Sequence, residues 1–243
     1  MYDEIFVMID VGRPVKDIQI DSSTSIEKIF QELSQSGGFE SVNLSDGLEI
    51  LTEMISDDKC LKFISFVGAI VSTGLRGIIK DMMKNKWFDV GITTCGALDH
   101  DIARHFSHYN EGSFTMDDME LANQHIHRLG NVLVPMDSYG PLIEEKMTAF
   151  LEEEYAAGVR EMNTAEICRM IGKHLGEDSF LYWAYKNDIS IVVPGIMDGA
   201  VGNQIWMFSQ SHGDFKLNLF GDADLLSGLI FKAEKSGAFM IGG

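Results

Sequence analysis

The chain contains 243 residues, which is enough for one α/β domain with a substantial hydrophobic core. Apolar residues make up 45% of the sequence and charged residues 23%, which excludes a disordered chain, a collagen-like repeat and a disulfide-stapled mini-protein. The 37 acidic residues against 19 Lys and Arg give a formal charge of −18, which argues against nucleic-acid binding and favours a cationic partner such as a polyamine or a basic protein. The alternative is that the acidity serves solubility alone.

The cysteines and the N-terminus bear on the compartment. Cys60, Cys95 and Cys168 are far apart and form no CxxC motif, and their odd number fits a reducing environment. The N-terminus carries acids instead of a cationic start, so no signal peptide is predicted. The longest nearly apolar stretch, 63–71, is too short to span a membrane. We therefore expect a cytoplasmic protein with no membrane partner.

Two helices are predicted at 22–33 and 43–55, within an N-terminal helical extension of residues 1–60. From Lys62 onward, strands alternate with helices. Strands are expected at 62–67, 88–93, 131–134, 189–193, 215–220 and 238–241. Helices are expected at 72–85, 97–106, 141–156, 199–208 and 225–235, the last one capped by Asp222. Two further helices are expected, one after the capping box of Asn163 and Glu166 and one after a cap at Asp178. This alternation predicts an α/β fold with a mostly parallel sheet covered by helices on both faces.

In such sheets, ligands bind at the carboxyl ends of the strands. The segments that follow strands at that edge are 68–74, 93–101, 194–203 and 242–243. The first is rich in small residues and places the hydroxyl groups of Ser72 and Thr73 near a helix N-terminus, which favours an anion. The alternative is a tight turn between a strand and a helix. Neither a GxGxxG motif nor a P-loop occurs in the chain.

The next two segments carry acids and a thiol. Asp99, His100 and Asp101 together can hold a cation and move protons, or the two acids merely favour the first turn of a helix. Cys95 is interpreted as a buried core thiol in preference to a nucleophile, because no oriented base is found for it. Asp198 is placed to accept ribose hydroxyl groups or to bind an amine, or else it caps the next helix.

His125 and His127 form an HxH pair. No third ligand is spaced nearby, and the surrounding segment is charged and amphipathic, which is typical of solvated histidines. No metal site is therefore predicted.

Five blocks follow one another from about Lys62 to the last residue. They are FVGAIVSTGLRGII (66–79), DVGITTCGALDHDIARHF (89–106), RLGNVLVP (128–135), YWAYKNDISIVVPGIMDGAVG (182–202) and GAFMIGG (237–243). In order and spacing they resemble the deoxyhypusine synthase family, and the TTCGALDHD form is similar to its archaeal branch. The resemblance implies a Rossmann-like, NAD-binding catalytic domain over residues 61–243. It further implies an NAD-dependent transferase that oxidises spermidine and releases 1,3-diaminopropane. The aminobutyl group passes through an active-site lysine to one lysine of a translation initiation factor.

The resemblance also implies a homotetramer and a set of site residues. The implied NAD contacts are Gly68, Ala69, Ile70, Val71, Ser72, Thr94, Cys95, Gly96 and Asp198, the last at the ribose. Asp99 and His100 stand where an acidic pair faces spermidine in eukaryotic members, and Asn203 stands where those members have an Asp. His100 and Asn203 therefore each remove a negative charge near the amine. The family's catalytic lysine lies beyond Gly243, so no catalytic residue is expected in this chain, which is expected to be truncated, split or incomplete.

Two other functions fit the same residues. A homospermidine synthase-like enzyme would share the fold and the cofactor and transfer the aminobutyl group to a diamine. A truncated, non-catalytic paralogue would retain the dimer surface and act as a regulatory subunit.

Overall fold

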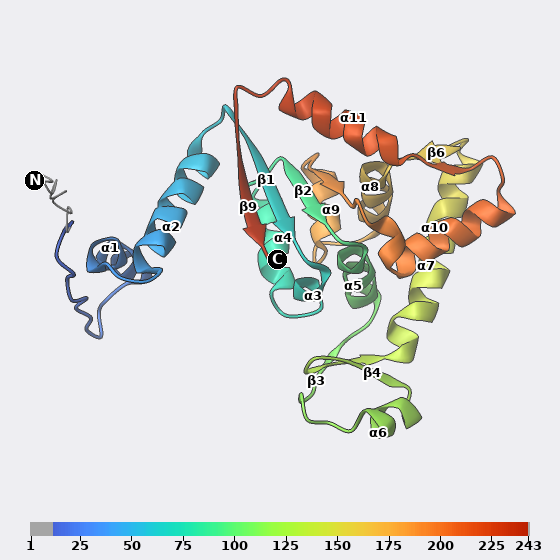
Figure 1. Cartoon of the computed structure of the whole chain (residues 1–243). Helices are drawn as coiled ribbons and strands as arrows, with labels where there is room; N and C mark the ends of the chain where they lie inside the picture. The colour runs from blue at the N-terminus through green and yellow to red at the C-terminus, as the bar shows by residue number, and fades with distance from the viewer. Residues whose placement is uncertain (1–11, 243) are drawn as a thin grey trace, which may run out of the picture. The chain divides into compact units, whose positions relative to one another are not determined.

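The computed structural model describes residues 12–242 and divides into two compact units, Met1–Asp57 and Asp58–Gly243. In the first unit, α1 (Ile26–Ser36) packs against α2 (Ser41–Ser56), so both predicted helices are present (Figure 1). Helix α1 begins later than predicted. Its cap is Ser25, whose hydroxyl accepts the N–H of Lys28, while the carboxylate of Asp21 holds the preceding residues in a turn.

The second unit is built on a four-stranded parallel sheet of order β7-β2-β1-β9 (Figure 1). These strands are β1 (Cys60–Phe66), β2 (Val90–Thr93), β7 (Ser190–Val192) and β9 (Lys235–Ile241). The register places Phe66, at the end of β1, beside Thr93 of β2 and Ile241 of β9. The carboxyl ends of these strands therefore meet at one edge. The predicted α/β fold with a mostly parallel central sheet is confirmed.

Helices join the strands and bury the sheet's apolar residues. They are α3 (Gly68–Val71), α4 (Arg76–Lys84), α5 (Cys95–Phe106), α7 (Gly140–Ala156), α8 (Thr164–His174), α9 (Phe180–Lys186), α10 (Ala200–Ser211) and α11 (Leu219–Ile230). Phe66 packs edge to face on Phe180 of α9, with ring centroids 5.5 Å apart. Ile64 and Val90 are fully buried in the same core. Among the described residues, no helix is both long enough and apolar enough to cross a membrane.

Residues 110–135 depart from the predicted alternation. The strand expected at 131–134 is present as β5 (Val132–Pro135), but it pairs antiparallel with β4 (Ile126–Leu129) and with β3 (Asn110–Glu111). With α6 (Asp118–Asn123), these strands form a small hairpin module apart from the parallel sheet (Figure 1). Gly130, with φ of +63°, opens the two-residue turn between β4 and β5, where a left-handed residue matches the twist of the strands.

Two carboxylates that the sequence predicts as helix caps have partners far along the chain. Asp222 lies within α11 and accepts the first N–H groups of α8, while Asn218 caps α11. Asp178 pairs with Arg76 of α4, and Ser179 caps α9 instead. Both predictions were wrong because a buried N–H or guanidinium group competes for a carboxylate, and only the tertiary fold reveals that partner.

Two predicted elements are shorter than expected. The strand expected at 215–220 is reduced to β8 (Lys216–Leu217), which pairs in parallel with β6 (Glu161–Met162), and α11 then begins at Leu219. The helix expected at 72–85 begins later, as α4 at Arg76, and the short helix α3 ends before the predicted range, at Val71. The hydroxyl groups of Ser72 and Thr73 donate to carbonyl groups three residues earlier, which closes α3 and starts a turn.

Candidate functional site

The carboxyl edge of the parallel sheet borders a cavity of about 450 Å³, here called the strand-end crevice. This volume lies within the range of pockets that hold small molecules and cofactors. Its walls are mostly apolar, and Asp198 supplies a carboxylate. The lining residues are Ser65, Phe66, Val67, Ile92, Thr93, Thr94, Pro194, Gly195, Asp198, Ile241 and Gly242.

The two turns that follow β1 and β2 lie directly against each other. The backbone N–H of Gly68 donates to Thr94 Oγ1 at 3.0 Å. A Cβ atom on Gly68 would lie 2.7 Å from both the Ala97 nitrogen and the Gly96 carbonyl carbon. Glycine is therefore required at residue 68 by the contact between the two turns.

The remaining residues of the first turn differ in exposure. Val71 and Ser72 are buried, Ile70 is half-buried and Ala69 is exposed. The Ser72 hydroxyl donates to the Ala69 carbonyl at 2.7 Å. This hydroxyl is thus engaged inside its own turn, which weakens the prediction that it binds an anion.

Asp99 is fully buried and fully hydrogen-bonded. Its Oδ2 accepts the Tyr139 hydroxyl at 2.7 Å and the Ala200 N–H at 2.9 Å. Its Oδ1 accepts the Val201 N–H at 2.9 Å and lies 3.8 Å from Cys95 Sγ. Asp99 therefore ties α5 to the start of α10 and to α7.

His100, the next residue, lies among aromatic groups. Its Nδ1 lies 2.9 Å from the Tyr109 hydroxyl, and its ring centroid is 5.5 Å from that of Tyr139. Burial lowers the pKa of His100, although the charge of Asp99 opposes the shift. Burial and the charge of Asp99 raise the pKa values of Tyr109 and Tyr139, which keeps both hydroxyl groups protonated. Sequence reasoning missed both tyrosines, because they lie 9 and 40 residues from their partners.

Asp101 serves the fold. It is fully buried and receives the Arg76 Nε at 2.7 Å, the Ser179 hydroxyl at 2.7 Å and the Leu181 N–H at 3.1 Å. These bonds hold α4 and the start of α9 against α5. The carboxylate therefore already has a cationic partner. It holds the fold together and does not provide the cation site that the sequence allowed.

Cys95 is the first residue of α5 and has no exposed surface. Burial, followed by the charge of Asp99, raises the pKa of its thiol to about 12. At neutral pH the thiol is protonated, which agrees with the interpretation of Cys95 as a core thiol.

Asp198 and Asn203 lie just before and within the first turn of α10. Asp198 ends a short 3₁₀ turn after β7, is exposed, and lines the strand-end crevice. Asn203 is exposed on the first turn of α10. The structure thus brings Thr94 and Asp198 together at the crevice, while Cys95 and Asp99 support it from within.

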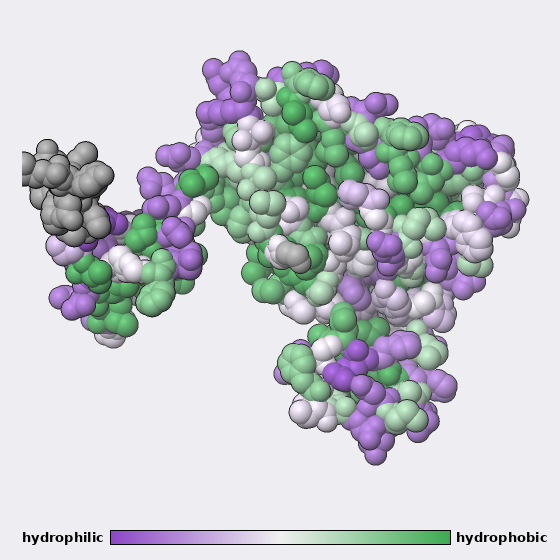
Figure 2. Space-filling view, in the orientation of Figure 1, coloured by the Kyte–Doolittle hydropathy of each residue, from purple (hydrophilic) through white to green (hydrophobic). Residues whose placement is uncertain are grey.

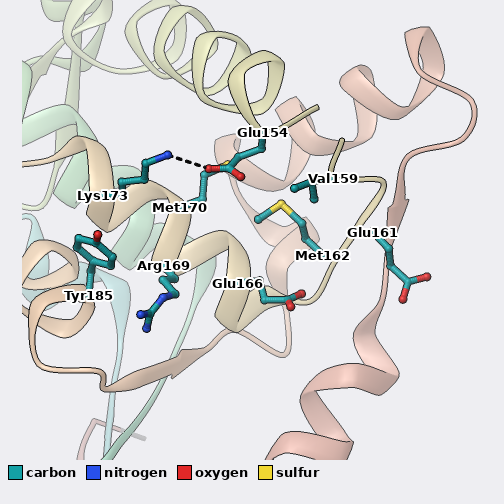
Figure 3. Close-up of a pocket in the computed structure, with 9 residues that line it drawn as sticks. All are labelled: Glu154, Val159, Glu161, Met162, Glu166, Arg169, Met170, Lys173 and Tyr185. Carbon is teal, nitrogen blue, oxygen red and sulfur yellow. Dashed lines mark hydrogen bonds and ion pairs between the residues drawn. The ribbon is translucent and has the colours of Figure 1, made fainter. Parts of the chain in front are cut away.

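A second cavity, of about 310 Å³, lies between α7, α8 and α9 (Figure 3). Its charged side chains are already paired. Lys173 contacts Glu153 at 2.9 Å and Glu154 at 3.3 Å, and the latter contact is drawn in Figure 3. Glu153 and Glu154 also group with His174 as possible metal ligands, but the Lys173 ammonium already contacts one oxygen of each carboxylate. This cavity is a weaker candidate than the strand-end crevice.

The fold is Rossmann-like α/β, with a cavity at the carboxyl edge of the sheet, where proteins of this class bind their ligands. The family model described as deoxyhypusine synthase matches residues 28–243. A probable deoxyhypusine synthase from Thermoplasma volcanium is 47% identical over 234 residues, which cover 96% of this chain and 75% of that protein. The corresponding protein of Thermoplasma acidophilum is 46% identical over the same share of each chain.

A crystal structure from Entamoeba histolytica, which carries the same family name, has the same fold. Its TM-score is 0.66 at 19% identity, and the match covers 94% of this chain and 82% of that one. The chain belongs to the deoxyhypusine synthase family.

Proposed function

We propose that this chain carries the cofactor site of an NAD-dependent transferase. The enzyme would move the aminobutyl group of spermidine to a lysine of a translation initiation factor. The observation that supports this proposal is family membership together with an exposed carboxylate, Asp198, on the wall of the strand-end crevice. The −18 charge of the chain is consistent with a polycationic substrate.

The residues around the crevice fit a dinucleotide. Asp198 can accept ribose hydroxyl groups, and its charge would repel the 2′-phosphate of NADP. The first turn of α5, beginning at Cys95, presents the positive end of a helix dipole toward the same edge and suits a diphosphate. Because the Cys95 side chain is buried, its contribution would be a backbone N–H. NAD, when bound, supplies the acceptor for a hydride.

The cofactor assignment is tested by calorimetry with NAD and NADP on the purified chain. NAD should bind more tightly than NADP. Asp198→Ala should weaken NAD binding by about 1–3 kcal/mol, the value of a hydrogen bond to a charged group. Asp224→Ala, an exposed acid on α11, is the matched control and should leave NAD binding unchanged. Tighter binding of NADP, or equal effects of the two variants, would contradict the assignment.

The polyamine would meet the residues that remain accessible near this edge. Of the three residues that the resemblance assigns to spermidine, Asn203 is exposed and His100 is half-buried. The lowered pKa of His100 keeps it neutral near pH 7, so it can accept a hydrogen bond from an ammonium group. The third residue, Asp99, has its carboxylate occupied inside the fold.

The covalent relay needs a lysine amine beside the reacting carbon. No described residue that lines the strand-end crevice is a lysine. We therefore propose that the 243-residue chain by itself does not complete the transfer. The test incubates the chain with NAD, labelled spermidine and either the initiation factor or putrescine. Label on the factor would show that a lysine of this chain serves in the relay after all, and label on putrescine would favour the homospermidine synthase-like alternative.

A homotetramer is proposed on the family resemblance, and the surface supports it. Apolar residues are widely exposed at the two ends of α11, with Phe220 at 85% and Phe231, just after the helix, at 88%, as is Met240 of β9 at 73%. Figure 2 shows hydrophobic side chains gathered over β9 and α11 on the face toward the viewer. Exposed patches of this kind favour association. Light scattering at micromolar concentration should give a mass above 27.1 kDa, and a monomeric mass would refute the assembly of this chain.

A further inference from the structure

Asp99 links three elements at the base of the strand-end crevice. It projects from the second turn of α5, and its two oxygens accept the N–H groups of Ala200 and Val201, which are the first two residues of α10. A helix leaves its first N–H groups without partners in its own backbone. Asp99 therefore caps α10 from outside, and its charge stabilises the positive end of that helix.

Tyr139 completes this arrangement from a third direction. It immediately precedes α7, and its hydroxyl donates to Asp99 Oδ2 at 2.7 Å. The same oxygen accepts the Ala200 N–H, so both oxygens of Asp99 are engaged. An ammonium group that approached Asp99 would have to displace these bonds and reach a side chain with no exposed surface.

The capped residues directly follow the turn that carries Asp198. A Cβ atom on Gly199, the intervening residue, would lie 2.6 Å from Asp99 Oδ2 and 2.8 Å from Cys95 Sγ. The turn thus rests on Asp99 itself. Any shift of the Asp99 carboxylate would move Gly199 and, with it, the adjoining Asp198 at the crevice wall.

From these contacts we infer that Asp99 and Tyr139 are positioning residues that fix the Asp198 turn in its ligand-binding position. The family resemblance instead assigns Asp99 to the polyamine. The inference rests on the proposed function, because it takes Asp198 as a cofactor contact. It adds Tyr139 to the site. It also gives Asp99 a different role: instead of binding the substrate, Asp99 holds Asp198 in place for the cofactor.

The test uses Asp99→Asn and Tyr139→Phe in the full chain, without polyamine. Each variant should raise the Kd for NAD by about tenfold, because each removes a hydrogen bond to a buried charge or the charge itself. In the double variant, the Kd for NAD should rise by less than the product of the two single-variant increases, because both residues act through one hydrogen-bonded cluster. Tyr155→Phe is the matched control, since its hydroxyl bonds the exposed Asp214.

Hydrogen exchange of residues 195–203 gives a second readout that needs no cofactor. Exchange in this segment should be faster in both variants and unchanged in Tyr155→Phe. Unchanged exchange would overturn the inference. A normal Kd for NAD together with a raised Kd for spermidine, measured for Asp99→Asn in a separate calorimetric titration, would also overturn it and return Asp99 to the polyamine. If the wild-type chain binds no NAD, the proposed function fails, while the exchange measurement still decides the positioning role.

Discussion

Replacing Gly68 by alanine should separate the two turns at the crevice. The added Cβ would lie 2.7 Å from two backbone atoms of the second turn and 2.9 Å from Thr94 Oγ1. Backbone atoms cannot move aside as a flexible side chain can, so we expect the upper end of the usual cost of overpacking, about 3 kcal/mol. In a unit of this size that corresponds to a fall in Tm of roughly 6–12 °C.

Two alanine variants of neighbouring glycines serve as controls. Gly74 ends the same segment, and a Cβ added to it would have no neighbouring atom within 4 Å, so Gly74→Ala should stay within about 0.5 kcal/mol of wild type. A Cβ added to Gly96, in the second turn, would have no neighbour closer than 3.9 Å, so Gly96→Ala should also keep its stability. The free energy of unfolding is measured in urea, and NAD binding by calorimetry. If Gly68→Ala were as stable as Gly74→Ala, the two turns would not be in the contact described.

Other predictions concern buried acids and the thiol. Asp222→Ala should lower the free energy of unfolding by about 1–2 kcal/mol in urea titrations, because the start of α8 loses its cap. Cys95 should resist alkylation at pH 8 until the protein unfolds, as peptide mass spectrometry would show, because its thiol is buried and its pKa is about 12. Although burial opposes it, the hydrogen bond from His105 and nearby positive charge lower the pKa of Asp178. Its stabilising contribution should therefore be present above pH 4 and be lost as the pH falls through the lowered pKa, and Asp178→Asn should flatten that loss in urea titrations between pH 5 and 3.

Much of the parallel sheet could be predicted because its strands are short apolar runs between helical patterns. The strands at 62–67, 88–93, 189–193 and 238–241 all have counterparts in the structure. The hairpin module was missed, although a usable pattern was present. Gly130-Asn131 stands between two four-residue strands, and this dipeptide is typical of a tight hairpin turn. The charged character of 126–129 concealed a strand that pairs with β5 in a sheet separate from the parallel one.

The site was predictable in position but not in the roles of its acids. Strand ends and small residues located the crevice, and they placed Thr94 and Asp198 there. Neither spacing nor resemblance revealed that Asp99 accepts hydrogen bonds from the start of α10, or that Asp101 forms an ion pair with Arg76. A carboxylate looks the same in sequence whether it meets a ligand or a buried N–H group. The partner that decides between them, such as Tyr139, lies far along the chain.

The central claim is that NAD binds in the strand-end crevice. Hydrogen exchange with and without NAD measures this directly, because a bound dinucleotide shields the backbone that it covers. We predict slower exchange at 66–72, 93–98 and 194–199 in the presence of NAD, with little change at 159–173 beside the second cavity. Protection at 159–173 with none at the three strand-end turns would contradict the account.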